Sequence, residues 1–295
     1  MSSLRRRTFA FRLDVDSLIC LEQGVPNLLR LGDRHGVRFT FFVNMGRSFS
    51  WRHTTVNVLR RRRNHGRGAD SADAPAPYKL SARRKLGWGG TLRTALFNPR
   101  LGRRFRSTMD LLHREGHELG LHGGSDHPAW QYSLDRLGDD GLERLFRPAF
   151  RSFRDRYGRP RGFASPGFRY NAAVLDLLDA EGFEYGSDMA GELPFRPDRS
   201  DGASRHSHFQ VPVNVIGERR TPVIEQELSR GQSDERIVRD ALDRIRARPF
   251  ALMYGHPYVE GVHLRPLAAI LSEVAGDYDV VTVEEYLRRW KERTV

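Results

Sequence analysis

Short apolar runs alternate along the chain with longer segments of helical periodicity. Residues 7–15 (RTFAFRLDV) form a mostly apolar run rich in aromatic and branched side chains, which predicts a strand. In residues 24–36 the apolar positions recur at helical spacing and the segment closes on Gly36, which predicts a helix. The same reasoning predicts further strands at 37–44, 117–123, 161–167, 183–189, 208–215 and 250–257.

Helices are predicted between most of these strands. They fall at 104–116, 137–158, 171–182, 233–249 and 265–276, and a last strand and helix share residues 278–290. Pro148 is expected to kink or end the second of these helices, because proline has no amide proton to donate. Roughly seven strand-then-helix units in series predict an α/β fold with a parallel sheet, most simply closed as a barrel. At 295 residues the chain fits such a barrel as a single domain.

The net charge of +12 is concentrated in one stretch. Sixteen basic and two acidic residues lie between Arg47 and Arg106, a balance of +14, so the rest of the chain carries −2. Residues 45–105 also interrupt the alternation of strands and helices, and Trp51 and Trp88 are mixed among the charges. We interpret 45–105 as a basic, aromatic-containing insertion after the second strand. It would press onto an anionic membrane surface or line the substrate entrance, where its arginines could receive phosphate.

The composition argues against a membrane-spanning or secreted protein. No apolar run approaches the about 20 residues that span a bilayer. The apolar stretch near the N-terminus is short and interrupted by Arg12, and no small-residue cleavage site follows, so a secretory signal is not expected. The single cysteine, Cys20, excludes an intrachain disulfide and a cysteine-rich zinc site, and it suits a reducing cytosol. We therefore expect a cytoplasmic protein.

Acidic, imidazole and guanidinium side chains follow the predicted strands one after another. In α/β barrels the loops at the carboxyl ends of the strands carry the functional groups, so these side chains are candidates for one site. They are Asp14 and Asp16 at the end of the first strand, His122 and His127 after the third, Arg169 after the fourth, Asp188 after the fifth and His256 after the last barrel strand.

This set of side chains predicts metal-assisted hydrolysis. Two neutral imidazoles and one carboxylate leave open positions on a divalent ion, as a catalytic site requires. Such an ion lowers the pKa of a bound water and polarises a carbonyl oxygen. Asp14 and Asp16 are two residues apart on a strand and point to the same face, so one can bind the ion while the other takes a proton. An imidazole across the site can protonate a leaving nitrogen.

A series of motifs covers almost the whole chain in order: RLDVDS, GVPNLLRL, HGVRFTFFVNMGR, GHELGLH, HPAWQ, SPGFR, YGSDM and PFRP. As a set they resemble the polysaccharide deacetylase (NodB-homology) superfamily, whose first motif pairs two aspartates and whose second pairs two histidines. The likeness is strongest to the cytoplasmic branch that contains the 4-deoxy-4-formamido-L-arabinose-phosphoundecaprenol deformylase. The resemblance implies a distorted (β/α)7-type barrel and a divalent metal ion, with Zn2+ favoured over Co2+, Ni2+ or Mn2+.

As metal ligands the resemblance implies Asp16, His122 and His127. The two histidines are five residues apart in HGGSDH, whereas the superfamily commonly sets them four apart. Either the loop bulges at its two glycines to restore the geometry, or Asp126, at the four-residue spacing, supplies an oxygen ligand instead. The proline that follows His127 matches the superfamily pattern and favours His127.

As catalytic residues the resemblance implies Asp14 as general base, Arg169 as the group that orients Asp14, and His256 as general acid. The stretch YGHPYVEG around His256 departs from the more acidic form of the deformylase, so formyl and acetyl both stay open as the acyl group. The remaining histidines are expected to be packing or solvent residues. Among these, His206 and His208 in HSH could bind a metal in principle, but nothing else supports a second site.

These observations predict a metal-dependent hydrolase that removes a formyl or acetyl group from an amino sugar. The sugar would be linked to a lipid phosphate, which the resemblance identifies as a polyprenyl phosphate, at the inner face of the cytoplasmic membrane. Trp130, Phe168 and Asp188 are candidates for contact with the substrate. One alternative is a deacetylase of soluble oligosaccharides or another small amide. The other is a non-catalytic basic protein that binds membranes or nucleic acid, although no nucleic-acid-binding signature is present.

Overall fold

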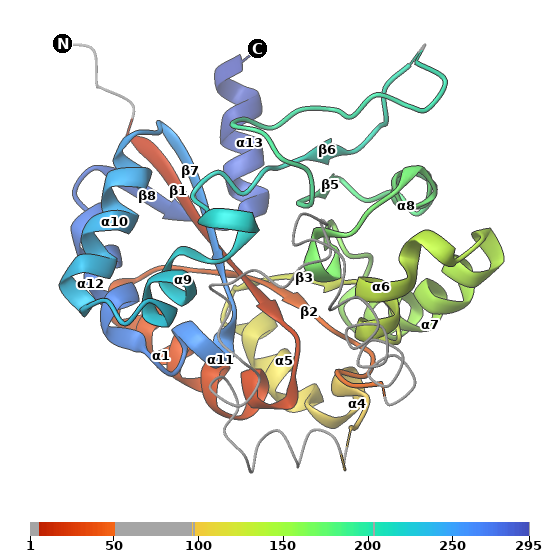
Figure 1. Cartoon of the computed structure of the whole chain (residues 1–295), viewed down its shortest axis with the longest axis horizontal. Helices are drawn as coiled ribbons and strands as arrows, with labels where there is room; N and C mark the ends of the chain where they lie inside the picture. Colours follow the sequence, from red (N-terminus) through yellow and green to blue (C-terminus); the bar gives the residue numbers. More distant parts are fainter. Residues whose placement is uncertain (1–5, 51–95, 97, 203, 295) are drawn as a thin grey trace, which may run out of the picture.

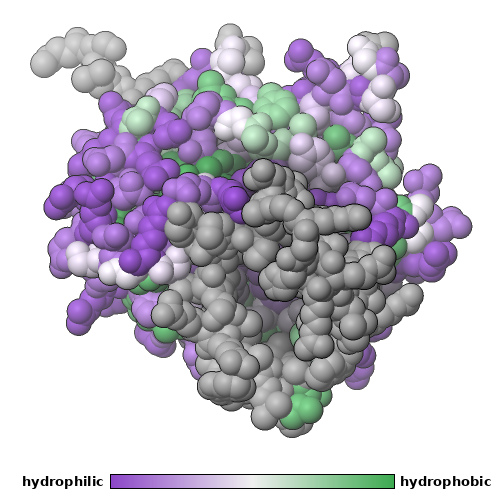
Figure 2. Space-filling model, viewed as in Figure 1, coloured by the Kyte–Doolittle hydropathy of each residue, from purple (hydrophilic) through white to green (hydrophobic). Residues whose placement is uncertain are grey.

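The computed structural model describes residues 6–50, 96, 98–202 and 204–294. Most of the predicted basic insertion, 45–105, therefore lies outside the described residues, and its role at a membrane or substrate entrance stays a prediction. Within the described residues no helix is both long enough and apolar enough to cross a bilayer. The described part of the face shown in Figure 2 is largely hydrophilic.

A parallel sheet of eight strands organises the described residues. Its order is β6-β5-β4-β3-β2-β1-β7, and β8 pairs with β1 beside β2. All pairings between these strands are parallel, as the sequence predicts. The strands are β1 (Arg7–Val15), β2 (Thr40–Val43), β3 (Glu118–His122), β4 (Gly162–Ala164), β5 (Tyr185–Gly186), β6 (Phe209–Gln210), β7 (Phe250–Gly255) and β8 (Tyr278–Val281).

Helices cover the sheet on both sides. Figure 1 shows β1 in the middle, with α1, α10 and α12 to one side and α6, α7 and α8 to the other. Every residue of β1 except Arg7 is buried, which is typical of a parallel strand that is covered on both faces. The α-helices are α1 (Val25–His35), α4 (Leu101–Arg104), α5 (Arg106–Arg114), α6 (His127–Ser133), α7 (Asp139–Tyr157), α8 (Ala172–Ala180), α9 (Val223–Ser229), α10 (Asp234–Arg246), α11 (Pro257–Glu260), α12 (Leu264–Val274) and α13 (Val283–Thr294).

Several helix boundaries follow the sequence signals, and one signal fails. Helix α1 ends at Gly36, whose φ of 63° lies in the left-handed region that glycine adopts at low cost. Helix α10 begins at Ser233, whose side chain accepts a hydrogen bond from the amide of Arg236. Pro148, in contrast, lies inside α7 and does not end it.

The sheet curls and closes in an irregular way. Strand β6 has only two residues, and the chain after it runs beside β7, where Val215 forms a parallel bridge with Met253. The Asn214 side chain completes this junction. Its Oδ1 accepts a hydrogen bond from the Leu252 amide at 2.8 Å, and its Nδ2 donates to the Phe250 carbonyl at 2.9 Å. The Asn214 side chain thus makes hydrogen bonds that the backbone of a regular neighbouring strand would make. The predicted distorted (β/α)7-type barrel is confirmed.

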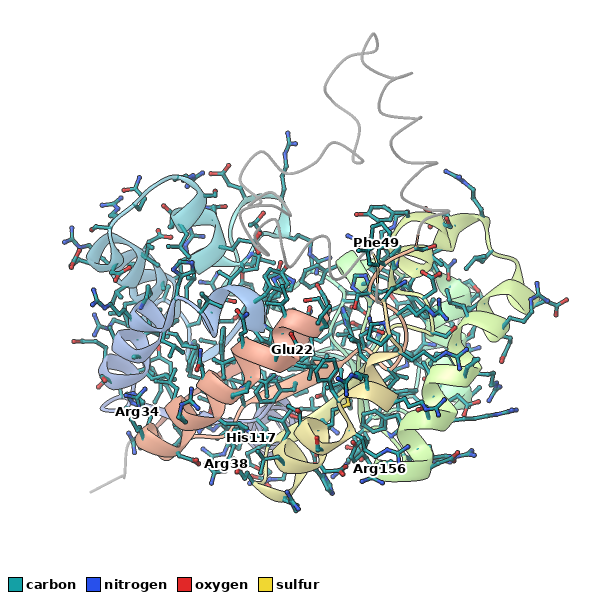
Figure 3. The ribbon with its side chains drawn as sticks, turned by 90° about the horizontal axis from the view of Figure 1, so that it is seen from below. Glu22, Arg34, Arg38, Phe49, His117 and Arg156 are labelled. Atoms are coloured by element: carbon teal, nitrogen blue, oxygen red, sulfur yellow. The ribbon has the colours of Figure 1, made fainter. Side chains whose placement is uncertain are left out.

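His117 belongs to the core beneath α1 and α5. Its ring stacks on Phe39 with centroids 5.8 Å apart, and its Nδ1 accepts a hydrogen bond from the Phe39 amide at 3.0 Å. Burial, together with the nearby Arg38 guanidinium, lowers the pKa of His117 from 6.5 to about 4 (Figure 3). The packing role expected for this histidine agrees with its place in the fold.

We expect His117 to make the protein less stable as the pH falls from about 6.5 towards 4. The unfolded chain takes up a proton on this histidine below its ordinary pKa, while the folded chain resists it, so stability is lost over that window. The full shift corresponds to roughly 3 kcal/mol. Asparagine offers a neutral acceptor for the Phe39 amide, so His117→Asn should flatten the dependence of unfolding free energy on pH. Urea denaturation at pH 7 and pH 4.5 measures this. Equal slopes in the two proteins would contradict it.

Candidate metal centre

Three side chains from three elements meet at the carboxyl end of the sheet. Asp16 directly follows β1, His122 is the last residue of β3, and His127 is the first residue of α6. The Nε2 atoms of His122 and His127 lie 3.0 Å and 3.2 Å from the same oxygen, Oδ1 of Asp16. Both imidazoles are buried, and the Asp16 side chain is 20% exposed. The structure therefore brings the three predicted ligands together.

The hydrogen bonding of His122 fixes how its ring faces Asp16. Its Nδ1 lies 2.9 Å from the carbonyl oxygen of Ala164, which can only accept, so Nδ1 carries the proton. In a neutral ring Nε2 then presents a lone pair to a carboxylate oxygen. Either a proton on Nε2 or a metal ion therefore lies between these two atoms. An outer hydrogen bond of this kind is the usual support of a metal-binding histidine.

The distances within this cluster fit a tetrahedral divalent ion. Ligand bonds of about 2.0–2.1 Å separate neighbouring donor atoms by roughly 3.3 Å in a tetrahedron. The two histidine–aspartate distances, 3.0 Å and 3.2 Å, are close to that separation. Burial alone would raise the pKa of Asp16, but His127, His122 and His256 face it and hold its pKa well below the ordinary value. The carboxylate is thus ionised and ready to bind a cation.

The loop between the two histidines resolves the alternative ligand at position 126. Gly123 has a φ of 64°, in the left-handed region, and a side chain at Gly124 would meet the Leu145 carbonyl oxygen at 2.6 Å. The loop therefore bulges, as one of the two alternatives expects. The Asp126 carboxylate accepts a hydrogen bond from the amide of Ala129 and caps α6. It is His127 that reaches Asp16.

Asp14 lies beside this cluster and is paired with Arg12. The Arg12 guanidinium donates to Asp14 Oδ2 at 2.9 Å and also bonds the Ser187 carbonyl oxygen. Arg12 is completely buried, and the rings of Phe42, Phe168 and Tyr254 lie within 5.0–5.4 Å of its guanidinium carbon. Because Arg12 and Asp14 are two residues apart on β1, their side chains share a face.

The structure corrects the place predicted for Arg169. Its guanidinium forms an ion pair with Asp135 at the surface and does not contact Asp14. The group that orients Asp14 is Arg12, which the sequence analysis treated only as an interruption of an apolar run. A charged residue in the middle of a buried strand, two positions before a candidate base, was the signal that could have identified it.

His256 faces the cluster from the other side, with a buried carboxylate behind it. Its Nε2 lies 3.6 Å from Asp16 Oδ2, and its Nδ1 lies 3.4 Å from Glu225 Oε2. Glu225 is completely buried on α9, and the His256 ring stacks on Tyr258 with centroids 5.0 Å apart. The sequence analysis missed Glu225 because it predicted no helix at 223–229, where an acidic residue stands within TPVIEQEL.

The three predicted substrate contacts have different surroundings. Trp130 is completely buried, and its indole nitrogen donates to the Arg169 carbonyl oxygen, so it packs the rim and cannot contact a substrate. Asp188 is also buried and accepts hydrogen bonds from the Ser165 amide at 2.7 Å and hydroxyl at 2.9 Å. Burial raises the pKa of Asp188. Phe168 is half-buried and lies beside Arg12, which leaves it as the candidate of the three that borders the site.

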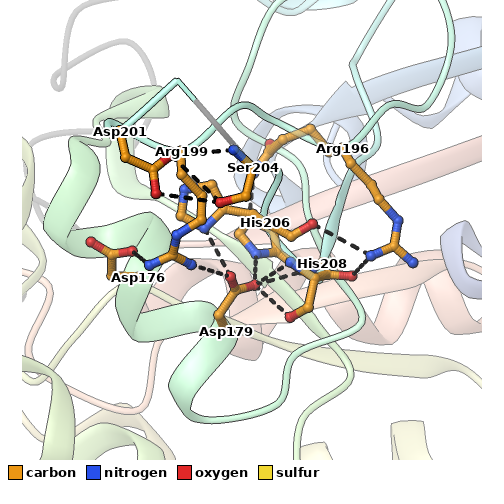
Figure 4. Close-up of polar contacts among 10 residues, drawn as sticks. Asp176, Asp179, Arg196, Arg199, Asp201, Ser204, His206 and His208 are labelled. Atoms are coloured by element: carbon orange, nitrogen blue, oxygen red, sulfur yellow. Dashed lines mark hydrogen bonds and ion pairs between the residues drawn. The ribbon is translucent and has the colours of Figure 1, made fainter.

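A second group of one aspartate and two histidines joins the end of α8 to the segment that precedes β6 (Figure 4). The Nδ1 atoms of His206 and His208 lie 2.9 Å and 2.6 Å from the Asp179 carboxylate. The same carboxylate also accepts hydrogen bonds from the Ser207 amide and hydroxyl and from the His208 amide, and it pairs with Arg199.

This second group is fully accounted for by hydrogen bonds. A separation of 2.6 Å is too short for two ligands on one ion, and the nearby Arg199 guanidinium already supplies a positive charge. Asp179 therefore fastens the segment around 206–208 to the end of α8. The packing role expected for His206 and His208 stays a prediction, because these two side chains and Asp179 also lie close enough together to hold an ion.

Comparisons with known proteins agree with the fold. A protein of Shewanella sediminis (strain HAW-EB3), assigned as the 4-deoxy-4-formamido-L-arabinose-phosphoundecaprenol deformylase ArnD, is 29% identical over 203 residues. The match covers 67% of this chain, and it spans 61% of that relative's length. No protein-family model matches the chain.

Solved structures of low sequence identity share the fold. A crystal structure assigned as a polysaccharide deacetylase from Mycobacterium smegmatis has a TM-score of 0.64 at 17% identity, covering 100% of this chain and 94% of that one. The PuuE allantoinase has a TM-score of 0.60 at 15% identity, covering 96% and 89%. The resemblance to the polysaccharide deacetylases is thereby confirmed, and at these identities the structural likeness establishes the fold alone.

Proposed function

We propose that this chain, which has the fold of the polysaccharide deacetylases, is a metal-dependent hydrolase that removes an N-acyl group from an amino sugar. One observation carries the proposal: Asp16, His122 and His127 meet around one point, with Asp14 and His256 on the same rim. These are the side chains that hydrolysis of an amide needs, and they come from loops at one end of the sheet.

Asp16, His122 and His127 would hold the ion, most simply Zn2+, with Co2+, Ni2+ or Mn2+ as alternatives. When bound, the ion lowers the pKa of a water molecule and polarises the substrate carbonyl. Asp14 would accept the proton of the attacking water molecule as general base. Arg12 fixes the direction of the Asp14 carboxylate through the 2.9 Å ion pair.

His256 serves as the general acid. As the bond between the carbonyl carbon and the nitrogen breaks, His256 donates a proton to the nitrogen, and the amino sugar leaves as an amine while the acyl group leaves as formate or acetate. The Glu225 carboxylate, 3.4 Å from Nδ1, faces the far side of the ring and helps to hold it in position. Asp14 and His256 thus divide the two proton transfers between them.

The substrate we propose is linked to a lipid phosphate, which would place the protein at the inner face of the cytoplasmic membrane. Two observations support this: the relative assigned as a phosphoundecaprenol-linked deformylase, and the +14 balance between Arg47 and Arg106. An anionic membrane surface would attract that stretch with about 1 kcal/mol for each basic residue near it.

A turnover assay with matched substrates tests this function. Zinc-loaded protein is given N-formyl and N-acetyl amino sugars, each as a polyprenyl-phosphate conjugate in detergent and as a free sugar, and the released formate or acetate is measured. We expect release from the lipid-linked pair to exceed release from the free sugars. A preference for free sugars would favour the soluble-substrate alternative. Failure to release acid from any of the four would refute the hydrolase.

A further inference from the structure

Arg220 lies next to the site and contacts the aromatic residue that borders it. The guanidinium carbon of Arg220 is 3.9 Å from the centre of the Phe168 ring, and the same ring is 5.0 Å from the guanidinium carbon of Arg12. The Tyr254 hydroxyl donates a hydrogen bond to the Arg220 carbonyl oxygen. The Phe168 ring thus separates Arg220 from Arg12, the ion-pair partner of the proposed base Asp14.

The charge of Arg220 has no protein partner in the part of the chain that the structure describes. None of the hydrogen bonds or ion pairs found there involves its guanidinium group. Arg12, in contrast, is satisfied by Asp14 and by the Ser187 carbonyl. Asp188 attracts Arg220 electrostatically, but its carboxylate makes its described hydrogen bonds to Ser165 and none to the Arg220 guanidinium.

Arg220 is only partly exposed to solvent. Burial lowers the pKa of Arg220, because its positive charge is less well solvated in the folded chain than in water. A guanidinium group has five N–H donors in a rigid fork, and here an aromatic face covers one side of it. The group is oriented, and the residues that the structure describes occupy none of its donors.

The backbone around this contact is held in an unusual conformation. Arg219 and Arg220 have φ values of 48° and 58°, and Phe168 has a φ of 57°. Residues with a β-carbon rarely adopt this left-handed region, and such residues persist where surrounding contacts impose them, often at ligand sites. Here the Gln226 side chain accepts a hydrogen bond from the Glu218 amide, and Tyr254 holds the carbonyl of Arg220. Both partners of the stacked pair are therefore fixed by strained backbone.

We propose that Arg220, stacked on Phe168, forms a subsite for a phosphate ester carried by the substrate, across the Phe168 ring from Arg12, the partner of the base Asp14. This inference rests on the proposed function and specifies which residue recognises the charged group of the amino sugar. A guanidinium fork binds two oxygens of a phosphate at once, and its stacking on Phe168 sets the plane in which it does so.

The test compares substrates that differ only in charge. Zinc-loaded full-length protein is given an N-acyl amino sugar as a short-chain alkyl phosphate diester, as a neutral alkyl glycoside, and as a uronate with a carboxylate in place of the phosphate. In Arg220→Gln the ratio of kcat/KM for the phosphate substrate to that for the neutral one should fall about 10- to 100-fold, mainly through KM. Arg220→Lys should restore part of the ratio, because lysine keeps the charge without the fork.

Arg219 provides the matched control. It is exposed, it neighbours Arg220 and it shares the left-handed backbone, so Arg219→Gln removes an equal charge from the same segment. We expect this variant to keep the phosphate preference of the parent protein. An unchanged ratio in Arg220→Gln, or an equal fall in both variants, would overturn the subsite. If the protein preferred the uronate to the phosphate substrate, the group that Arg220 recognises would be a carboxylate and not a phosphate.

A binding measurement separates this inference from the proposed function. Metal-free protein is titrated calorimetrically with the deacylated sugar phosphate diester, so that neither hydrolysis nor a metal–phosphate contact contributes. Binding that is present in the parent and in Arg219→Gln but weakened about 10-fold or more in Arg220→Gln supports the subsite, even if no acyl substrate is hydrolysed. Absence of any difference between parent and Arg220→Gln refutes it, even if hydrolysis is observed.

Discussion

Replacing Asp14 with asparagine is expected to abolish hydrolysis while leaving the bound metal in place. Asparagine has nearly the same shape, so the packing around this buried side chain is kept, but its amide cannot accept a proton from water. Loss of a positioned general base lowers kcat by about 10²- to 10⁴-fold. The three proposed ligands, Asp16, His122 and His127, remain as they are, so the metal content should stay at one ion per chain.

Initial rates and elemental analysis of the same purified samples measure the two halves of this prediction. Arg169→Gln is an informative companion, because sequence reasoning made Arg169 the partner of Asp14 whereas the structure pairs it with Asp135. If the structure is right, Arg169→Gln leaves kcat within about two-fold of the parent, since an exposed ion pair contributes little. Unchanged turnover in Asp14→Asn would remove Asp14 from the role of base.

The parts of the site that the sequence revealed are those attached to regular strands. Asp14, His122 and His256 each stand at the end of an apolar run that could be recognised as a strand. In a parallel sheet those ends meet at one edge, so finding the strands was enough to bring the residues together. The same logic explains why the fold was predicted: buried parallel strands are the most distinctive pattern in a sequence of this kind.

What the sequence could not reveal depends on side-chain partners across the fold. Arg12 and Arg169 are both plausible partners for a carboxylate, and only the direction in which each leaves its backbone decides between them. Glu225 comes from a short helix whose apolar residues do not distinguish it from a loop. Trp130 was expected at the rim, but whether a rim aromatic faces inward or outward is not encoded in local periodicity.

Loss of the metal is the second large effect we expect, in Asp16→Asn and in His122→Ala. Asp16 is the one ionised group in the proposed ligand set, and its Oδ1 is shared by both histidines, so removing its charge weakens the attraction for a divalent ion most. His122→Ala removes a ligand whose ring is already held by the hydrogen bond from Nδ1 to the Ala164 carbonyl oxygen. Little free energy is needed to orient this ring for a metal, so its loss weakens metal binding strongly. Both variants should bind far less than one ion per chain and lose activity with it.

The Asp179 group supplies the control for this prediction, since it has the same composition of one aspartate and two histidines. Elemental analysis after dialysis against dilute zinc should give one ion per chain for the parent and for His208→Ala, because Asp179 already holds its histidines by direct hydrogen bonds. A drop of one ion in His208→Ala would show that this second group also binds metal. If both Asp16→Asn and His122→Ala retained one ion per chain, the metal would bind elsewhere in the protein. The proposed base Asp14 and acid His256 would then lie beside a group of residues that holds no ion.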